Sequence, residues 1–246
     1  MSTIYHQNVE DIFDPQVLSN RVGKLEEQDV HLWGIRRNIF NGLKDYSKYL
    51  LSEDEQNRAQ RFRFRKDHDL FVIGRYLTKV ILAYYTDSTP ERVNIIPDSF
   101  GKPSCGMDLF FNISHADDRL LLGFSTTEIG VDIEAIDTNV DIERIGERHF
   151  SEIEFQKMMT YAGDERAETF FEIWTQKESL VKGIGKGLSI PLKDFNVINP
   201  NGKVLWEFPN EKKYGDWYVQ NIEVQQGFKS AFATQKEIVN LLLSQI

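Results

Sequence analysis

The chain has 246 residues, of which 41% are hydrophobic and 27% are charged, as is usual for a globular protein of one large or two small domains. Its net charge of −9 argues against general nucleic-acid binding, and its single cysteine, Cys105, excludes an internal disulfide framework and suits a reducing cytosol. The first residues lack the basic and apolar regions of a signal peptide, and Arg75 and Lys79 interrupt the longest apolar run, so we expect a cytoplasmic protein with no membrane partner.

The predicted elements of the first half begin with a strand at residues 30–35. A helix opens at Ser52, and Glu55 three residues later completes a capping box. A helical apolar repeat over residues 67–85 is long enough for a central helix. Three short strands follow, at residues 109–113, 120–124 and 129–133, and we expect them to form an antiparallel meander.

The second half repeats this order of elements. Helices are predicted at residues 142–150, 151–161 and 168–182, and strands at residues 204–208, 217–224 and 228–233. Each half thus has a long helix and about three strands. Strands grouped apart from helices favour an α+β fold over a parallel doubly wound sheet. The connection at residues 134–141 is the predicted boundary, which gives domains 1–134 and 135–246.

Two carboxylates lie two residues apart on a predicted strand. Asp132 and Glu134 share one face, with Cα atoms about 6.6 Å apart, while Ile129, Val131 and Ile133 take the other face. Two carboxylates this close raise each other's pKa unless a cation lies between them, so the pattern indicates a metal site. The alternative is a solvated polar face.

A third carboxylate lies on the apolar side of a predicted helix. Glu178 falls between Phe171 and Trp174 on the helical wheel, where an unpaired charge is costly, so we expect a partner or a shifted pKa. Lys182 is its i,i+4 neighbour, and a structural ion pair is the alternative interpretation.

Basic residues cluster in an otherwise acidic chain, and this cluster comprises Arg58, Arg61, Arg63, Arg65 and Lys66. Such a group is typical of a site for phosphate or for an acidic partner, and a solvated helix end is the alternative.

These segments together resemble the 4′-phosphopantetheinyl transferases, specifically the larger monomeric class that activates surfactin-type peptide synthetases. The resemblance covers residues 30–233. The motifs that carry it are Gly101-Lys-Pro103, Phe111-Asn-Ile-Ser-His115, Gly130-Val-Asp-Ile-Glu134 and Trp174-x-x-Lys-Glu178-x-x-x-Lys182. It implies a monomeric pseudodimer of two similar α+β halves, each a long helix packed on a small antiparallel sheet, with the active site in the cleft between them.

The resemblance also implies a reaction, in which the phosphopantetheine arm of coenzyme A moves to a serine hydroxyl of an apo acyl or peptidyl carrier protein and adenosine 3′,5′-bisphosphate is released. Asp132, Glu134 and Glu178 would hold Mg²⁺, with Mn²⁺ as an alternative. Glu178, or a metal-bound water that it orients, is the candidate base, and Lys182 would bind the departing phosphate.

Four further residues would contact coenzyme A by the same resemblance. Ser114 and His115 would reach its phosphates, Lys102 would meet a phosphate of the nucleotide half, and Arg58 would lie near the pyrophosphate. A Ser-His dipeptide is otherwise typical of a turn. Lys177 belongs to the last motif, and a structural role is its alternative.

The chain departs from the family pattern at Leu70, where a basic residue commonly contacts the nucleotide phosphate. His68, Arg63 or Arg65 would compensate, or the affinity for coenzyme A would be lower. The acidic helix of a carrier protein would be steered to basic residues, and the candidates are Arg36, Arg37 and the cluster at residues 58–66. Two other functions remain open, a metal-dependent pyrophosphate hydrolase and a non-catalytic module that binds coenzyme A or a carrier protein.

Overall fold

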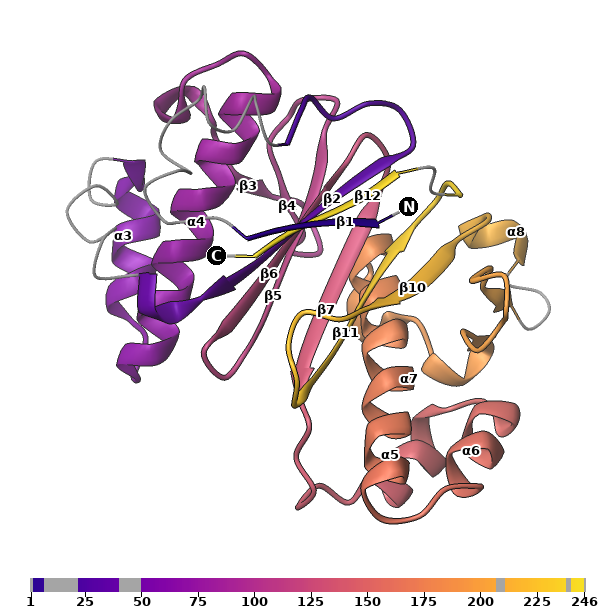
Figure 1. Cartoon of the computed structure of the whole chain (residues 1–246). Coiled ribbons are helices and arrows are strands. Elements are labelled where there is room, and N and C mark those ends of the chain that lie inside the picture. Colours follow the sequence, from indigo (N-terminus) through magenta and orange to yellow (C-terminus); the bar gives the residue numbers. More distant parts are fainter. Residues whose placement is uncertain (1, 7–21, 40–49, 207–210, 238–239, 246) are drawn as a thin grey trace. The chain divides into compact units, whose positions relative to one another are not determined.

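The computed structural model of the chain describes residues 2–6, 22–39, 50–206, 211–237 and 240–245 (Figure 1). These residues form two compact units. Unit 1 comprises Met1–Asp98, Pro103–Thr126 and Ile238–Ile246, and unit 2 comprises Ser99–Lys102 and Thr127–Glu237. The predicted boundary after Glu134 lies inside one strand, Ile129–Ala135, all of which belongs to unit 2. The division into two α+β halves, 1–134 and 135–246, stays a prediction.

Unit 1 contains a five-stranded sheet in the order β1-β12-β2-β6-β5. Its strands are β1 (Ser2–His6), β2 (Asp29–Arg36), β5 (Phe110–Ala116), β6 (Arg119–Ser125) and β12 (Asn240–Gln245). The pairs β2–β6 and β5–β6 are antiparallel, whereas β12 is parallel to both β1 and β2. Because β12 is parallel to its two neighbours, this sheet is mixed rather than purely antiparallel, and neither β1 nor β12 was among the predicted strands.

Two helices, α3 (Glu53–Gln60) and α4 (Arg65–Tyr85), cover one side of this sheet (Figure 1). Helix α4 packs on β6 and places Leu77 and Ile81 in a core with Trp33 of β2, and all three side chains are fully buried. The smaller elements of unit 1 are η2 (Arg37–Ile39), η3 (Pro90–Arg92), β3 (Ile96–Pro97) and β4 (Pro103–Ser104).

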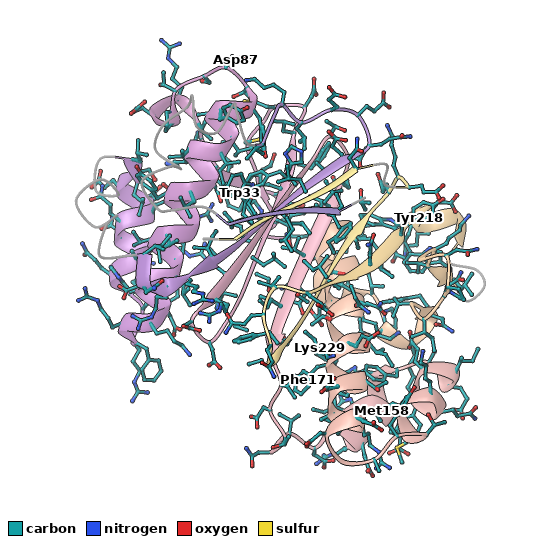
Figure 2. The ribbon with its side chains drawn as sticks, viewed as in Figure 1. Trp33, Asp87, Met158, Phe171, Tyr218 and Lys229 are labelled. Atoms are coloured by element: carbon teal, nitrogen blue, oxygen red, sulfur yellow. The ribbon has the colours of Figure 1, made fainter. Side chains whose placement is uncertain are left out.

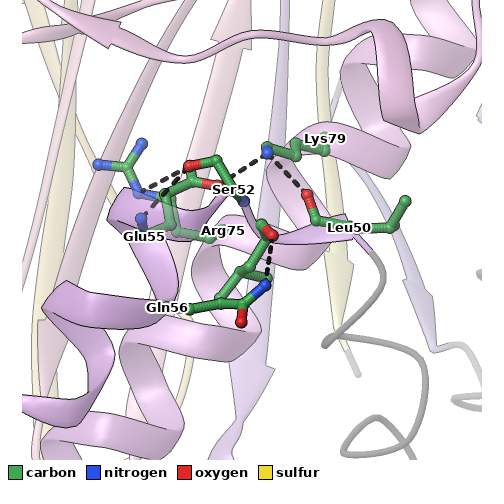
Figure 3. A network of polar contacts seen from close by, with 7 residues as sticks. Leu50, Ser52, Glu55, Gln56, Arg75 and Lys79 are labelled. Atoms are coloured by element: carbon green, nitrogen blue, oxygen red, sulfur yellow. Dashed lines mark hydrogen bonds and ion pairs between the residues drawn. The ribbon is translucent and has the colours of Figure 1, made fainter.

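A buried ion pair joins the two helices of unit 1 (Figure 3). The Nζ of Lys79 on α4 donates to Oε2 of Glu55 on α3 at 2.8 Å and to the carbonyl of Leu50 at 2.8 Å. Glu55 also accepts the backbone N–H of Ser52, which confirms the predicted capping box at the start of α3. The position of α3 on α4 is therefore fixed by a network of polar contacts as well as by apolar packing.

Unit 2 contains an antiparallel sheet in the order β10-β11-β7 with the long helix α7 (Gly163–Ile184) packed on β7 and β11 (Figure 1). The strands are β7 (Ile129–Ala135), β10 (Tyr218–Ile222) and β11 (Phe228–Thr234). The other elements are α5 (Ile142–His149), α6 (Glu152–Met159), η4 (Gly187–Ser189), η5 (Leu192–Asp194), β8 (Phe195–Asn196), β9 (Leu205–Trp206) and α8 (Glu211–Tyr214).

Each unit has its own apolar core. Figure 2 labels Trp33 in unit 1 and Met158 in unit 2, and neither side chain is exposed to solvent. The α+β class is confirmed, and each unit has one helix of more than 20 residues packed on antiparallel strands. The internal similarity that a pseudodimer requires stays a prediction. No helix in the described part of the chain combines the length and apolar character needed to cross a bilayer.

The predicted meander of three strands is wrong at its third strand. β5 and β6 pair as expected, but β7 pairs with β11, about 100 residues later in the chain, with Val131 opposite Phe232. The pattern of residues in β7 predicts a buried strand without identifying its neighbour. Of the predicted strand 204–208, β9 forms residues 205–206, and residues 207–208 lie outside the described residues.

Candidate active site

Strand β7 places two carboxylates on the same face, as the sequence predicts. Asp132 is almost fully buried and Glu134 is partly buried, while Val131 and Ile133 of the alternate face are completely buried. A strand buried on both faces does not offer a solvated polar surface. The alternative that the Asp-x-Glu pair is such a surface is therefore excluded for Asp132.

Helix α7 presents three polar or amphipathic side chains to these carboxylates at intervals of four residues. Trp174 lies near enough to the Glu134 carboxylate to favour its ionised form, and Nζ of Lys182 lies 2.5 Å from Oδ1 of Asp132. Glu178, which lies between Trp174 and Lys182 on the same helix face, is partly buried. The ion pair of Lys182 therefore crosses from α7 to β7 and joins Asp132, rather than running along the helix to Glu178.

The carboxylates perturb one another's protonation. Burial raises the pKa of Glu134 to about 7, repulsion from Asp132 and Glu178 acts in the same direction, and Lys182 opposes both effects. Burial and the charge of Asp132 also raise the pKa of Glu178, while Lys182 again opposes the shift. Of the two alternatives predicted for Glu178, a partner or a shifted pKa, this is the second. Nearby positive charge would therefore favour the ionised form of both glutamates.

The donor set fits a divalent cation in charge and chemistry. Three ionised carboxylates carry −3 and Lys182 carries +1, which leaves −2, and oxygen ligands of this kind are those that Mg²⁺ prefers. Among the described residues, no three acidic, histidine or cysteine side chains are already arranged as ligands around one point. Asp132, Glu134 and Glu178 thus share one electrostatic neighbourhood without converging as a ligand set, and metal ligation by them stays a prediction.

A backbone contact sets the distance between α7 and β7. A Cβ atom on Gly130 would lie 1.9 Å from the carbonyl oxygen of Ser179 and 2.3 Å from the backbone nitrogen of Gly183. Only glycine allows the helix to approach the strand this closely. Because Asp132 follows Gly130 on β7 and Glu178 precedes Ser179 on α7, this contact also determines how near the carboxylates lie.

Lys102, predicted to meet a coenzyme phosphate, is held by unit 2 itself. Its Nζ donates to the carboxylate of Glu128 and to the carbonyl oxygen of Gly183 at the end of α7, and its side chain is largely buried. A bond from Lys102 to a phosphate would therefore require an exchange of partners.

The remaining predicted coenzyme contacts lie in unit 1. Ser114 and His115 are within β5 rather than after it, with Ser114 buried and His115 exposed, as alternation along a strand requires. Arg58 is exposed in the last turn of α3, and its guanidinium lies 5.2 Å above the ring of Phe71. Contact of these three residues with one coenzyme stays a prediction.

The structure explains the departure at Leu70, because this side chain is buried in the core of unit 1. Two of the residues expected to compensate are engaged elsewhere. Arg65 Nε donates to Oδ1 of the buried Asp69 at 3.1 Å, and His68 Nδ1 lies 3.1 Å from the same oxygen. Arg37 also binds Asp69, through its Nη1 at 3.0 Å.

Comparison with known proteins decides the family. A model described as 4′-phosphopantetheinyl transferase, N-terminal, matches residues 44–126, and one described as 4′-phosphopantetheinyl transferase superfamily matches residues 128–233. The 4′-phosphopantetheinyl transferase Sfp of Bacillus subtilis (strain 168) is 30% identical over 185 residues, which cover 74% of this chain and 80% of that protein. The chain belongs to the 4′-phosphopantetheinyl transferase superfamily.

Two other relatives are similar to this chain to about the same extent. The 4′-phosphopantetheinyl transferase gsp of Aneurinibacillus migulanus is 30% identical over 213 residues, which cover 86% of each chain. The 4′-phosphopantetheinyl transferase HetI of Nostoc sp. (strain PCC 7120) is 31% identical over 171 residues, which cover 67% of this chain and 72% of that protein. The resemblance to this enzyme class is therefore confirmed.

Sequence reasoning missed three parts of the site of the transferase. The proximity of Trp174 to Glu134 and the close contact at Gly130 depend on how α7 packs on β7, which no local pattern specifies. The sequence signal for the position of Trp174 was its spacing, four residues before Glu178 on the same helix face. The third is the environment of Lys177, whose side chain is fully buried.

A cavity of about 680 Å³ beside the β10–β11 hairpin is lined by none of the predicted site residues.

Proposed function

We propose that the transferase moves the 4′-phosphopantetheine group of coenzyme A to a serine hydroxyl of an apo acyl or peptidyl carrier protein, in an Mg²⁺-dependent reaction that releases adenosine 3′,5′-bisphosphate. The observation that carries the proposal is the group of Asp132, Glu134, Glu178 and Lys182 on β7 and α7 of a chain that belongs to this superfamily. Three carboxylates can hold a divalent cation, and that cation together with Lys182 would neutralise negative charge on a diphosphate.

The proposed reaction breaks one P–O bond and forms another. The serine oxygen attacks the phosphorus that carries the pantetheine arm, and the bond from this phosphorus to the oxygen of the nucleotide phosphate breaks. Mg²⁺ held by Asp132, Glu134 and Glu178 would neutralise charge on the diphosphate oxygens. Glu178 would accept the proton of the serine, either directly or through a water that it orients.

Lys182 has two tasks in this scheme. Its ammonium group compensates the buried charge of Asp132, and the proposal assigns it a further hydrogen bond to the departing phosphate. An ammonium group has three donors, so one bond to a carboxylate is compatible with a second bond to a phosphate oxygen. Arg58, Lys102, Ser114 and His115 are the proposed contacts to the other phosphates of coenzyme A.

The proposed surface for the carrier protein is the exposed part of the basic residues in unit 1. Arg37 and Arg65 bind Asp69, and Lys66 binds Asp117 at 3.2 Å, so these three are partly neutralised. The structure gives no ion pair to another described residue for Arg36, Arg61 or Arg63, and all three are exposed. These three are the best placed to attract the acidic helix of a carrier protein.

Mass spectrometry of a carrier protein tests the proposal. Purified enzyme, coenzyme A and Mg²⁺ are incubated with apo acyl and apo peptidyl carrier proteins, and the carrier should gain the mass of one phosphopantetheine group. Glu178→Ala should abolish the gain. Cleavage of coenzyme A without any carrier would indicate a pyrophosphate hydrolase instead. Binding of coenzyme A without turnover of any carrier would indicate a non-catalytic module.

A further inference from the structure

Lys177, the residue before the candidate base, occupies a closed cage of acceptors in unit 2. Its Nζ lies 2.7 Å from Oε2 of Glu154 and donates to the carbonyl oxygens of Leu192 at 2.7 Å and Phe195 at 2.8 Å. It also lies 4.2 Å from the centre of the Phe195 ring. Neither the lysine nor the glutamate side chain is exposed to solvent. A buried ammonium group is tolerated only with such a complete set of partners.

Glu154 extends this cage to two further segments of the chain. Its Oε1 accepts the backbone N–H of Val197 at 2.8 Å, and its Oε2 accepts the backbone N–H of Ser151 at 2.8 Å, which forms the capping box of α6. The pair of Lys177 and Glu154 therefore ties α7 to the start of α6 and to the segment at residues 192–197. A network in which every buried polar group is satisfied holds its members in one arrangement.

The cage determines which way Glu178 points. Consecutive residues of an α-helix are about 100° apart, so fixing the direction of Lys177 fixes the direction of Glu178 as well. On the strand side, Gly130 of β7 meets the helix backbone at Ser179 and Gly183. Helix α7 is thus held by the cage through Lys177 and by the glycine contact at neighbouring residues. Rotation of the helix about its axis would break one or both.

We propose that Lys177 is a positioning residue whose buried pair with Glu154 sets the rotation of α7, so that Glu178 and Lys182 face Asp132 and Glu134. The inference rests on the proposed function, because it assigns the purpose of this orientation to the divalent cation and the serine proton. A purely structural lysine would stabilise unit 2 without affecting affinity for the cation. A positioning lysine affects that affinity even in variants that remain folded.

The experiment compares Lys177→Met with a matched control in unit 1. Lys79 is also a buried lysine on a long helix, bound to one glutamate and one backbone carbonyl, and Lys79→Met removes a comparable pair (Figure 3). A second variant combines Lys177→Met with Glu154→Gln, which removes the buried charge that the first substitution leaves unpaired. Circular dichroism identifies a temperature at which all variants are folded.

Affinity for Mn²⁺ alone, measured at that temperature from the electron paramagnetic resonance signal of the free ion, is the primary measurement. Both variants at Lys177 should bind Mn²⁺ at least about 10-fold more weakly than the unmodified protein. A loss of this size is typical when a residue that orients a metal ligand is removed. The affinity of Lys79→Met for Mn²⁺ should stay within about twofold of that of the unmodified protein. In the transfer assay, kcat should fall for the Lys177 variants.

Three results would overturn the inference. Unchanged affinity for Mn²⁺ in the folded Lys177 variants would show that Lys177 is structural only, and an equal loss in Lys79→Met would show that the effect is a general consequence of destabilisation. These two results leave the proposed function intact. Failure of the unmodified protein to bind Mn²⁺ would instead refute the metal site of the proposed function, and the positioning role with it.

Discussion

Gly130→Ala tests whether the close contact between α7 and β7 is required for activity. The added Cβ would lie 1.9 Å from the carbonyl oxygen of Ser179, 2.3 Å from the nitrogen of Gly183 and 2.8 Å from its Cα. All three are backbone atoms, so no side chain can rotate away. A nonbonded carbon and oxygen stay about 3 Å apart, so the helix must move away from the strand by about 1 Å.

This displacement has consequences for stability and for catalysis. Overpacking of a close contact costs about 1–3 kcal/mol, and with only backbone atoms available to move we expect a value of about 3 kcal/mol for Gly130→Ala. A displacement of about 1 Å between reacting groups lowers kcat about 100-fold. The measurements are urea unfolding and steady-state transfer to an apo carrier protein at a temperature where the variant is folded.

Gly74→Ala is the matched control for this prediction. Gly74 is also buried, on α4, but its added Cβ would meet only side-chain atoms of Leu120 and Ile113, at 3.5 Å or more. Because alanine favours a helix by about 1 kcal/mol over glycine, this substitution should leave stability unchanged or raise it. The reasoning is refuted if Gly130→Ala retains both the stability and the kcat of the unmodified protein.

Three further predictions follow from the charges. Because the pKa of Glu134 is raised to about 7 from the 4.5 of an exposed glutamate, the folded metal-free protein holds a proton that the unfolded chain loses, and its stability should fall as pH rises from about 4.5 to 7. Thermal unfolding in EDTA should show this slope and Glu134→Gln should reduce it, whereas an equal slope in both would contradict the assignment. Lys182→Met leaves Asp132 as a buried charge without its ammonium partner. This substitution should therefore lower the free energy of unfolding by about 3 kcal/mol in urea and should lower kcat. An unchanged unfolding midpoint would argue against the ion pair. If Arg36, Arg61 and Arg63 attract the carrier protein, added salt should raise KM for the carrier with little change in kcat, and a KM independent of salt would exclude this surface.

The local features of the site were predictable from the sequence because they depend on periodicity. Alternation along residues 129–135 places Asp132 and Glu134 on one face, and the helical repeat places Glu178 beside Trp174. The start of α7 was predicted five residues late, at 168 instead of Gly163, because its first turn is polar and carries no apolar repeat.

The features that the sequence analysis missed depend on contacts between distant segments. The pairing of β7 with β11, the bond of Lys182 to Asp132 and the bonds of Lys102 to Glu128 and Gly183 join residues far apart in the chain. Helical spacing relates Lys182 to Glu178, and the family resemblance singles out Lys102, but neither identifies the partners that the structure gives these lysines. The partners of Lys177 were likewise not predictable from the sequence. Its side chain is fully buried, as is typical of a structural residue, although it directly precedes the candidate base Glu178.

Locating Mn²⁺ in crystals grown with coenzyme A tests most directly whether Asp132, Glu134 and Glu178 bind one cation together. The account predicts an anomalous density peak at about 2.1 Å from carboxylate oxygens of Asp132, Glu134 and Glu178, with the diphosphate completing the coordination. A peak bound by other residues, or one that none of these three carboxylates reaches, would contradict the account.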